Sequence, residues 1–168
     1  AGKDFLAGVC VKWEENVADI SALGIRTSII RTGVVLSKTG GALEQMAMPV
    51  KFGAGAALGS GKQYIPWIHI DDICALYIKA IEDEKFEGIF NGVGTQHINN
   101  KDFTKTIAKV LKRPCFLPNI PEFVIKTALG EKAVIALKGN KVSAEKIEKF
   151  GFKHQFTKLE DALKDLLK

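Results

Sequence analysis

Cysteine is scarce in this sequence, and long apolar runs are absent. Cys10, Cys74 and Cys115 are odd in number, lie far apart and form no C-x-x-C pair, so neither a disulfide framework nor a zinc site is expected. No apolar run is long enough to span a bilayer, and the first residues lack the charged-then-apolar pattern of a secretory signal. We therefore expect a protein of the reducing cytoplasm.

Arginine is also scarce, which bears on the net charge of +5. Because the chain is basic, nucleic-acid binding is one function class to consider. However, Arg26, Arg31 and Arg113 are the only arginines, and base-reading proteins favour arginine for bidentate contacts. The lysines alternate with acidic residues, as in solvated helix faces. Nucleic-acid binding is therefore disfavoured.

What is present is an ordinary globular composition, with 46% hydrophobic and 26% charged residues over 168 positions. This length fits one domain, or one domain with an appendage. Apolar spacing predicts a helix from Phe5 to about Gly24, and the β-branched run Ile25–Leu36 predicts a largely buried strand. Further short strands are expected over 64–70, 88–94 and 152–156.

Helix start and stop signals predict the remaining elements. The expected helices are 42–52, interrupted at Pro49; 73–84, capped by Asp71 or Asp72; 101–112, capped by Asn99 or Asn100; 121–137; a short one between Ser143 and Gly151; and 160–167, opened by a Thr157-x-x-Glu160 capping box.

The glycine-rich stretch Gly59–Asp72, GSGKQYIPWIHIDD, resembles a phosphate loop but lacks its essential parts. A Walker A motif needs a glycine where Ala56 stands and Ser or Thr where Gln63 stands. A dinucleotide motif starting at Gly53 needs a third glycine where Leu58 stands. The loop also leads into a strand, whereas a phosphate loop leads into a helix N-terminus. Phosphate binding by this loop is therefore disfavoured.

Several polar side chains in or near this stretch have two possible roles, one functional and one structural. His69 is either a substrate contact or proton relay, or a half-buried histidine bonded to the backbone, and the second reading is favoured. Asp71 and Asp72 are either a carboxylate pair or a helix cap, and the cap is the simpler explanation. Asn91 lies in a predicted strand and needs partners, so we expect it to tie two loops together.

The order of three segments resembles a known enzyme family. RTSIIRTGVVL, GSGKQYIPWIHIDDICALYI and GIFNGVGTQHINNKDF are similar to the second half of extended short-chain dehydrogenases/reductases. The closer resemblance is to the atypical, NAD(P)-dependent, nucleotide-sugar epimerase-like group, which ends in a small C-terminal domain of unknown function. RPCFLPNIPEFVIKTALGE and the final LEDALKDLL are similar to that domain, so the resemblance covers essentially the whole chain.

The resemblance implies an α/β fold: a partial Rossmann-type parallel sheet edge with a small helical substrate-side lobe. Residues 1–114 are expected to form the C-terminal part of the epimerase-like domain, and residues 115–168 the small helical domain. Arg26–Thr32 should pair in parallel with Ile89–Val93. Val34–Leu36 should pair with Trp67–Ile70.

The family also has a dinucleotide loop and a Tyr-x-x-x-Lys catalytic pair, and neither is in this sequence. The residues four beyond Tyr64 and Tyr77 are Ile68 and Ile81. The chain is therefore expected to be a fragment of an NAD(P)-dependent epimerase or reductase. Alone, it should neither turn over nor bind NAD(P) tightly.

The site residues implied by the resemblance are few. Thr32 and Gly33 are candidate contacts at the cofactor edge, and Gln63, Trp67 and His69 are candidates for the substrate pocket. No catalytic residue and no metal ligand are expected in this chain.

Two departures from classical nucleotide-sugar epimerases argue for a smaller or more apolar substrate. Val34 stands where those enzymes place an asparagine on the sugar nucleotide, and Ile65 stands where they place an arginine on its phosphates. Two other function classes stay open: a protein-interaction module, under the cell-division-inhibitor label that some members carry, and a nucleic-acid binder. An exposed strand edge predicts a homodimer or domain swap.

Overall fold

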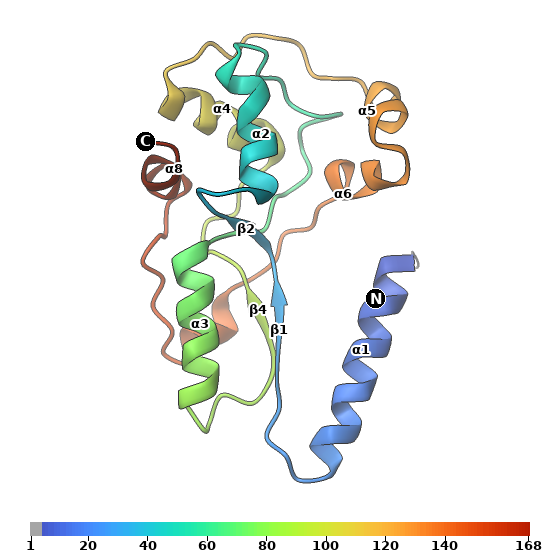
Figure 1. Cartoon of the computed structure of the whole chain (residues 1–168), viewed down its shortest axis with the longest axis vertical. Helices are drawn as coiled ribbons and strands as arrows, with labels where there is room; N and C mark the ends of the chain where they lie inside the picture. Colours follow the sequence, from blue (N-terminus) through green and yellow to red (C-terminus); the bar gives the residue numbers. More distant parts are fainter. Residues whose placement is uncertain (1–4) are drawn as a thin grey trace.

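The computed structural model describes residues 5–168, in which helices alternate with parallel strands (Figure 1). This is the predicted α/β fold. The elements are α1 Phe5–Ala22, β1 Ser28–Thr32, β2 Val34–Leu36, α2 Gly41–Lys51, β3 Trp67–His69, α3 Ile70–Glu82, β4 Gly88–Gly92, α4 Asn100–Leu111, α5 Glu122–Leu129, a 3-10 turn at Gly130–Lys132, α6 Ala133–Leu137, α7 Glu145–Lys149 and α8 Leu159–Leu167.

Two parallel strand pairs form the centre of the molecule. β1 pairs with β4, with Ser28 opposite Gly88 and Thr32 opposite Gly92. β2 pairs with β3, with Val34 opposite Trp67. Both pairings agree with the sequence prediction. β1 is half-buried to exposed, however, so the prediction of a largely buried strand is wrong there; among the described residues it has only β4 as a strand neighbour.

Gly33 separates the two pairs, because the backbone changes partner at this residue. Its N–H donates to the Gly92 carbonyl at 3.0 Å, and the next N–H, that of Val34, donates to the Pro66 carbonyl at 2.7 Å. A Cβ atom at position 33 would overlap the Pro66 carbonyl oxygen. Only glycine therefore allows the two sheets to approach this closely.

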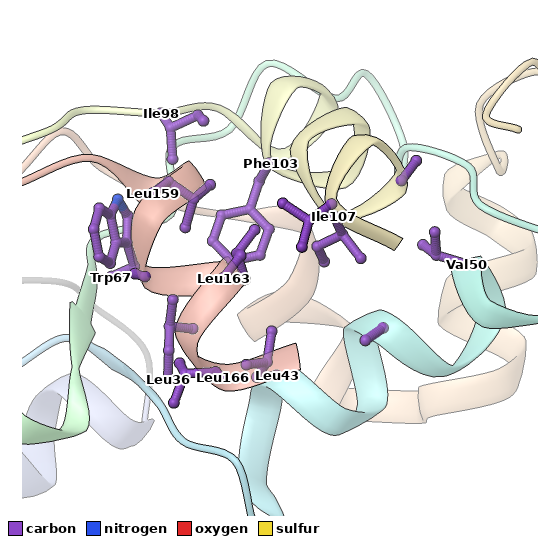
Figure 2. Packing of buried hydrophobic residues seen from close by; sticks show 14 residues of the cluster. Leu36, Leu43, Val50, Trp67, Ile98, Phe103, Ile107, Leu159, Leu163 and Leu166 are labelled. Carbon is purple, nitrogen blue, oxygen red and sulfur yellow. The ribbon is translucent and has the colours of Figure 1, made fainter. Parts of the chain in front are cut away.

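The β2–β3 pair lies between two hydrophobic cores, because successive strand residues point to opposite faces. Leu36 and Trp67 belong to the larger core, which α2, α4 and α8 complete (Figure 2). Ile68 points to the other side and packs with Phe86 and Phe90 in the second core. Trp67 and Ile68 thus lie on opposite faces of β3, and both faces are covered.

The outer edge of β4 is covered by the chain that leads into α7. The Lys146 ammonium donates to the Ile89 carbonyl at 2.6 Å and lies 4.3 Å from the centre of the Phe90 ring. Asn91 donates to the Ser143 carbonyl at 3.1 Å, so its amide has the expected partner but joins strand β4 to the segment before α7 rather than two loops.

Two interruptions differ from the sequence prediction. α2 continues through Pro49 to Lys51, because the helix ends two residues later and loses only the hydrogen bond of the proline nitrogen. Conversely, the predicted helix over 121–137 is divided into α5, a 3-10 turn and α6. Gly130 takes a positive φ of 56° at the break, which an α-helix does not accommodate.

Two predictions near the C-terminus are wrong. Residues 152–156 are irregular rather than a strand. The Thr157-x-x-Glu160 capping box does not form, since the residue before α8 is Lys158 and its own side chain makes no capping hydrogen bond. Glu160 instead pairs with Lys109 at 2.6 Å and with Lys164 at 3.0 Å.

Helix α1 stands apart from the body of the molecule (Figure 1). Its predicted extent is confirmed, but two of its large apolar residues stay exposed, Trp13 at 67% and Ile20 at 44%, while Val9 and Val17 are half-buried. An ion pair between Glu14 and Arg31 links it to β1 at 2.6 Å. Within residues 5–168 every helix is too short or too polar to cross a lipid bilayer.

Candidate functional site

The carboxyl ends of β1 and β4 meet at one edge of their sheet, where Thr32 lies opposite Gly92. In open α/β sheets, ligands bind in the crevice outside this edge. The chain leaves β4 as the loop Val93–Ile98 and leaves β1 through Gly33. A Cβ at Gly33 would contact the Val93 side chain as well as Pro66, so both exits lie side by side. This edge is the candidate site.

A small cleft opens beside this edge, between the glycine-rich stretch, the loop after β4 and the segment before α7. Pro66 and Gly94 are among its lining residues, next to the Gly33 crossover. Its volume is about 10 Å³, which is room for a water-sized group. The full lining is Tyr64, Ile65, Pro66, Gly94, Gln96, His97, Ile98, Asn140, Lys141 and Val142.

The polar lining of the cleft carries no acidic side chain. Tyr64, Asn140 and Lys141 offer a hydroxyl, an amide and an ammonium group, and His97 is bonded through Nε2 to the Val142 carbonyl at 2.9 Å. This set suits the oxygens of a polar or anionic small molecule. Among the described residues, no group of three or more His, Cys, Asp or Glu side chains is placed to hold a metal ion.

Of the two candidates for the cofactor edge, Thr32 is exposed and Gly33 is the crossover. The Thr32 hydroxyl lies 3.1 Å from the Tyr77 hydroxyl on α3. Beside it, Arg31 donates twice to the Glu14 carboxylate, at 2.7 and 2.6 Å. This hydrogen bonding lowers the pKa of Glu14 below its ordinary value and raises that of Arg31.

Gln63, the first pocket candidate, uses both amide hydrogens within the protein. Nε2 donates to the Leu58 carbonyl and to the Ala136 carbonyl, each at 3.0 Å. The side chain therefore joins the glycine-rich stretch to α6. Asn100 accepts from the N–H of Leu58, the residue just before this stretch, at 2.8 Å.

Trp67 and His69, the other two pocket candidates, are each only 1% exposed. The Trp67 indole N–H donates to the Gln96 carbonyl at 3.1 Å. The His69 ring stacks on Phe156 with centroids 3.7 Å apart, and its Nδ1 accepts from the Asp71 N–H at 3.2 Å. The favoured reading of a backbone-bonded histidine is thus confirmed, although the residue is fully rather than half buried.

His69 Nε2 has no hydrogen-bond partner, and the nearest carboxylate oxygen, on Asp165 of α8, lies 3.4 Å away. His69 is also the N-cap of α3, so the prediction that Asp71 or Asp72 caps this helix is wrong. Asp71 is exposed. Asp72 is 2% exposed and accepts from the N–H groups of Gln155 at 2.7 Å and Phe156 at 3.1 Å. The two carboxylates therefore do not form a pair.

A role for Gln63, Trp67 and His69 in substrate contact stays a prediction. The sequence prediction missed the loop residues Gln96–Ile98 and the segment Asn140–Val142, which line the cleft. One signal was available for the loop: it directly follows a predicted parallel strand, and such loops form the ligand side of α/β sheets. The segment before α7 carries no comparable signal.

Comparison with known proteins now gives these features a context. The model of a domain of unknown function, DUF1731, matches residues 120–166. An Arabidopsis thaliana protein, the chloroplastic homologue of epimerase family protein SDR39U1, is 36% identical over 167 residues, which are 99% of this chain and 48% of that protein. The chain is similar to these epimerase-family proteins. It spans about half the length of the curated relatives it matches.

Two solved structures extend the comparison. The human epimerase family protein SDR39U1, crystallised with NADPH, aligns with a TM-score of 0.79 at 35% identity, covering 84% of this chain and 48% of that one. A nucleoside-diphosphate sugar epimerase from Corynebacterium glutamicum aligns with a TM-score of 0.78 at 30% identity, covering 99% of this chain and 32% of that one. The predicted resemblance to the epimerase-like family is therefore confirmed, as is the Rossmann-type α/β architecture.

Proposed function

We propose that this chain is the substrate-side part of an NAD(P)-dependent epimerase or reductase, and that it is inactive without a dinucleotide-binding part. The observation that carries the proposal is the β1–β4 pair. Its carboxyl edge opens on a cleft, yet the chain contains neither a G-x-G-x-x-G loop nor a Tyr-x-x-x-Lys pair. Phosphate cradling and hydride positioning both require groups of that kind.

We propose that NAD(P) reaches this chain only at Thr32 and Gly33. The support is positional: both residues lie at the carboxyl end of β1, where nicotinamide cofactors approach such sheets. The relative crystallised with NADPH supports the same cofactor class. Thr32 would offer its hydroxyl and Gly33 a backbone that a cofactor can approach closely. When bound, the cofactor would supply the hydride chemistry.

For the substrate, we propose a small molecule rather than a nucleotide sugar. The cleft has room for only a water-sized group, so one polar group of a substrate would enter it but a whole diphosphate would not. Ile65 also stands where classical enzymes place an arginine on the phosphates. Tyr64, Asn140 and Lys141 would orient one polar group of the substrate. Gln63 and Trp67 would support the cleft from behind, since their own donors are bonded to backbone carbonyls.

We also propose that residues 115–168 are a distinct module in sequence that depends on residues 1–114 to fold. Leu159 and Leu163 of α8 complete the same core as Leu36 and Trp67, and Gln63 bonds to α6.

In the isolated chain, a second copy would cover the open edge of β1 and the exposed side chains of α1. The exposed Phe116 and Phe123, at 78% and 70%, favour the second candidate function, a protein-interaction module.

Calorimetric titration of NADPH into the 168-residue chain tests the main proposal. We expect no binding in the micromolar range, whereas human SDR39U1 as a control should bind. Adding the part of a relative that this chain does not match should restore NADPH binding to the mixture. Micromolar binding by the chain alone would overturn the proposal. Light scattering on the same sample should give a dimer, and a monomer at high concentration would contradict the proposed self-association.

A further inference from the structure

The loop Val93–Ile98, which lines the cleft, is held from two sides. One side is the segment Ile65–Trp67. The Gly94 N–H donates to the Trp67 carbonyl at 2.6 Å, the Trp67 indole donates to the Gln96 carbonyl at 3.1 Å, and the Ile65 N–H donates to the Ile98 carbonyl at 2.9 Å. These bonds fix the inner edge of the loop to the wall of the buried core.

The other side is the C-terminal segment 142–159, which bonds to four of the six loop residues. His154 Nε2 lies 2.9 Å from the Val93 carbonyl, and the Thr95 hydroxyl donates to the Thr157 carbonyl at 3.4 Å. The Leu159 N–H donates to Gln96 Oε1 at 2.6 Å. His97 Nε2 lies 2.9 Å from the Val142 carbonyl. We call residues 142–159 the strap.

Asp72 anchors the strap in its C-terminal half. Its buried carboxylate accepts the N–H groups of Gln155 and Phe156, which have no regular secondary structure to satisfy them. A carboxylate buried this deeply persists only when it is hydrogen-bonded, so the anchor and the strap require each other. Phe156 then stacks on His69, one strand position beyond Ile68.

We propose that Asp72 is a positioning residue for the candidate site: it holds the strap, and the strap sets the position of the loop Val93–Ile98. That the loop position matters for ligand binding rests on the proposed function. The coupling of the loop to Asp72 through the strap does not. The buried aspartate of the WIHIDD stretch is thereby assigned a role that neither helix capping nor catalysis gives it.

Fluorescence of Trp67 provides the test, because its indole is bonded to the loop. The chain has two tryptophans, so Trp13→Phe leaves Trp67 as the only one. In this background, Asp72→Asn replaces one of two acceptor oxygens with a donor, and Asp71→Asn is the matched control at an exposed neighbour. Emission, acrylamide quenching and amide exchange by mass spectrometry are compared, with far-UV circular dichroism to monitor folding.

We expect Asp72→Asn to shift Trp67 emission to longer wavelength, to increase quenching and to accelerate exchange in both 154–159 and 93–98. Exchange around Phe103 and Ile107 in the larger core should stay slow, and Asp71→Asn should change none of these readings. Faster exchange in the strap alone, with the loop and Trp67 unchanged, would overturn the proposal, as would no change at all.

If Asp72→Asn prevents folding, Gln96 decides the question. Gln96→Ala removes the acceptor of the Leu159 N–H, whereas Gln96→Glu retains an oxygen at that position. We expect the Trp67 and loop signals to change in Gln96→Ala and to be restored in Gln96→Glu. A folded Gln96→Ala variant with unchanged signals would refute the coupling. None of these readings involves a cofactor, so a failure of the proposed function leaves the test intact.

Discussion

Helices α1 and α8 lie near the two ends of the described chain, and both carry apolar residues at helical spacing. α8 buries Leu159, Leu163 and Leu166 against α2 and α4 (Figure 2). α1 leaves Trp13 and Ile20 in solvent and is linked to β1 through the ion pair of Glu14 with Arg31.

The difference shows that an amphipathic pattern specifies a helix but not its partner. α8 finds a surface within this chain, whereas no surface among the described residues covers the apolar side of α1. Most helical stability in proteins comes from packing of that side. α8 should therefore belong to the cooperative folding unit, and α1 should contribute little to it.

The largest expected effect separates the two helices directly. Leu163→Ala should lower the free energy of unfolding by about 3 kcal/mol, because it leaves a cavity in the larger core. The matched change Ile20→Ala, in α1, should stay within about 0.5 kcal/mol. Urea unfolding monitored by circular dichroism measures both. Equal losses would mean that α1 is packed in solution.

A second pair of substitutions compares Gly33, where the chain crosses between the two sheets, with Gly8 in the exposed helix α1. Gly33→Ala should cost about 1–3 kcal/mol, because its methyl group meets the Pro66 carbonyl and neither sheet can move away freely. Gly8→Ala meets nothing within 4 Å and should raise the helical content of α1, with a gain of up to about 1 kcal/mol. Thermal unfolding and far-UV circular dichroism distinguish them. A destabilised Gly8→Ala would contradict the exposed placement of α1.

The smallest expected effect concerns the solvent side of α8. Hydrogen bonds from Lys109 and then Lys164 lower the pKa of Glu160 from its ordinary 4.5 to about 2. As the pH falls, the unfolded chain binds this proton first, so the stabilisation is complete above pH 4.5 and is lost towards pH 2. Glu160→Gln should flatten this part of the stability profile in urea titrations at stepped pH. Lys109→Met should reproduce most of the flattening; an unchanged slope would show that the ion pairs are solvent-screened.

Strand pairing was predictable from the sequence. The strands lie in β-branched or apolar runs, and the family resemblance indicates which strands are neighbours. The Asn99 cap of α4 was also predicted correctly, whereas the caps of α3 and α8 and the site were not. The N-cap of α3 is His69 rather than an aspartate, because Asp72 is taken by strap N–H groups more than eighty residues away in sequence. Glu160 likewise leaves its capping box for Lys109. A capping pattern in the local sequence fails to predict the cap wherever a distant segment offers the same side chain a better hydrogen-bond partner.

The same reasoning explains why the cleft was only partly anticipated. Gln63 and Trp67 were chosen for their place beside the glycine-rich stretch, but Gln63 bonds to α6 and Trp67 bonds to the loop after β4. The residues that face the cleft come from three segments, and Asn140 and Lys141 carry no pattern that marks them. Their role depends on how the chain after α6 returns to the sheet.

The packing of α7 against β4 limits where further strands can be added to the sheet. Lys146 already occupies the Ile89 carbonyl, and α7 lies against β4, so a further strand cannot hydrogen-bond along that side. Within residues 5–168, no strand pairs with the other side of β1. Any larger sheet that incorporates this chain must therefore grow beside β1 and keep β4 as its last strand, which gives the sheet one direction of extension and protects the opposite margin from edge-to-edge aggregation.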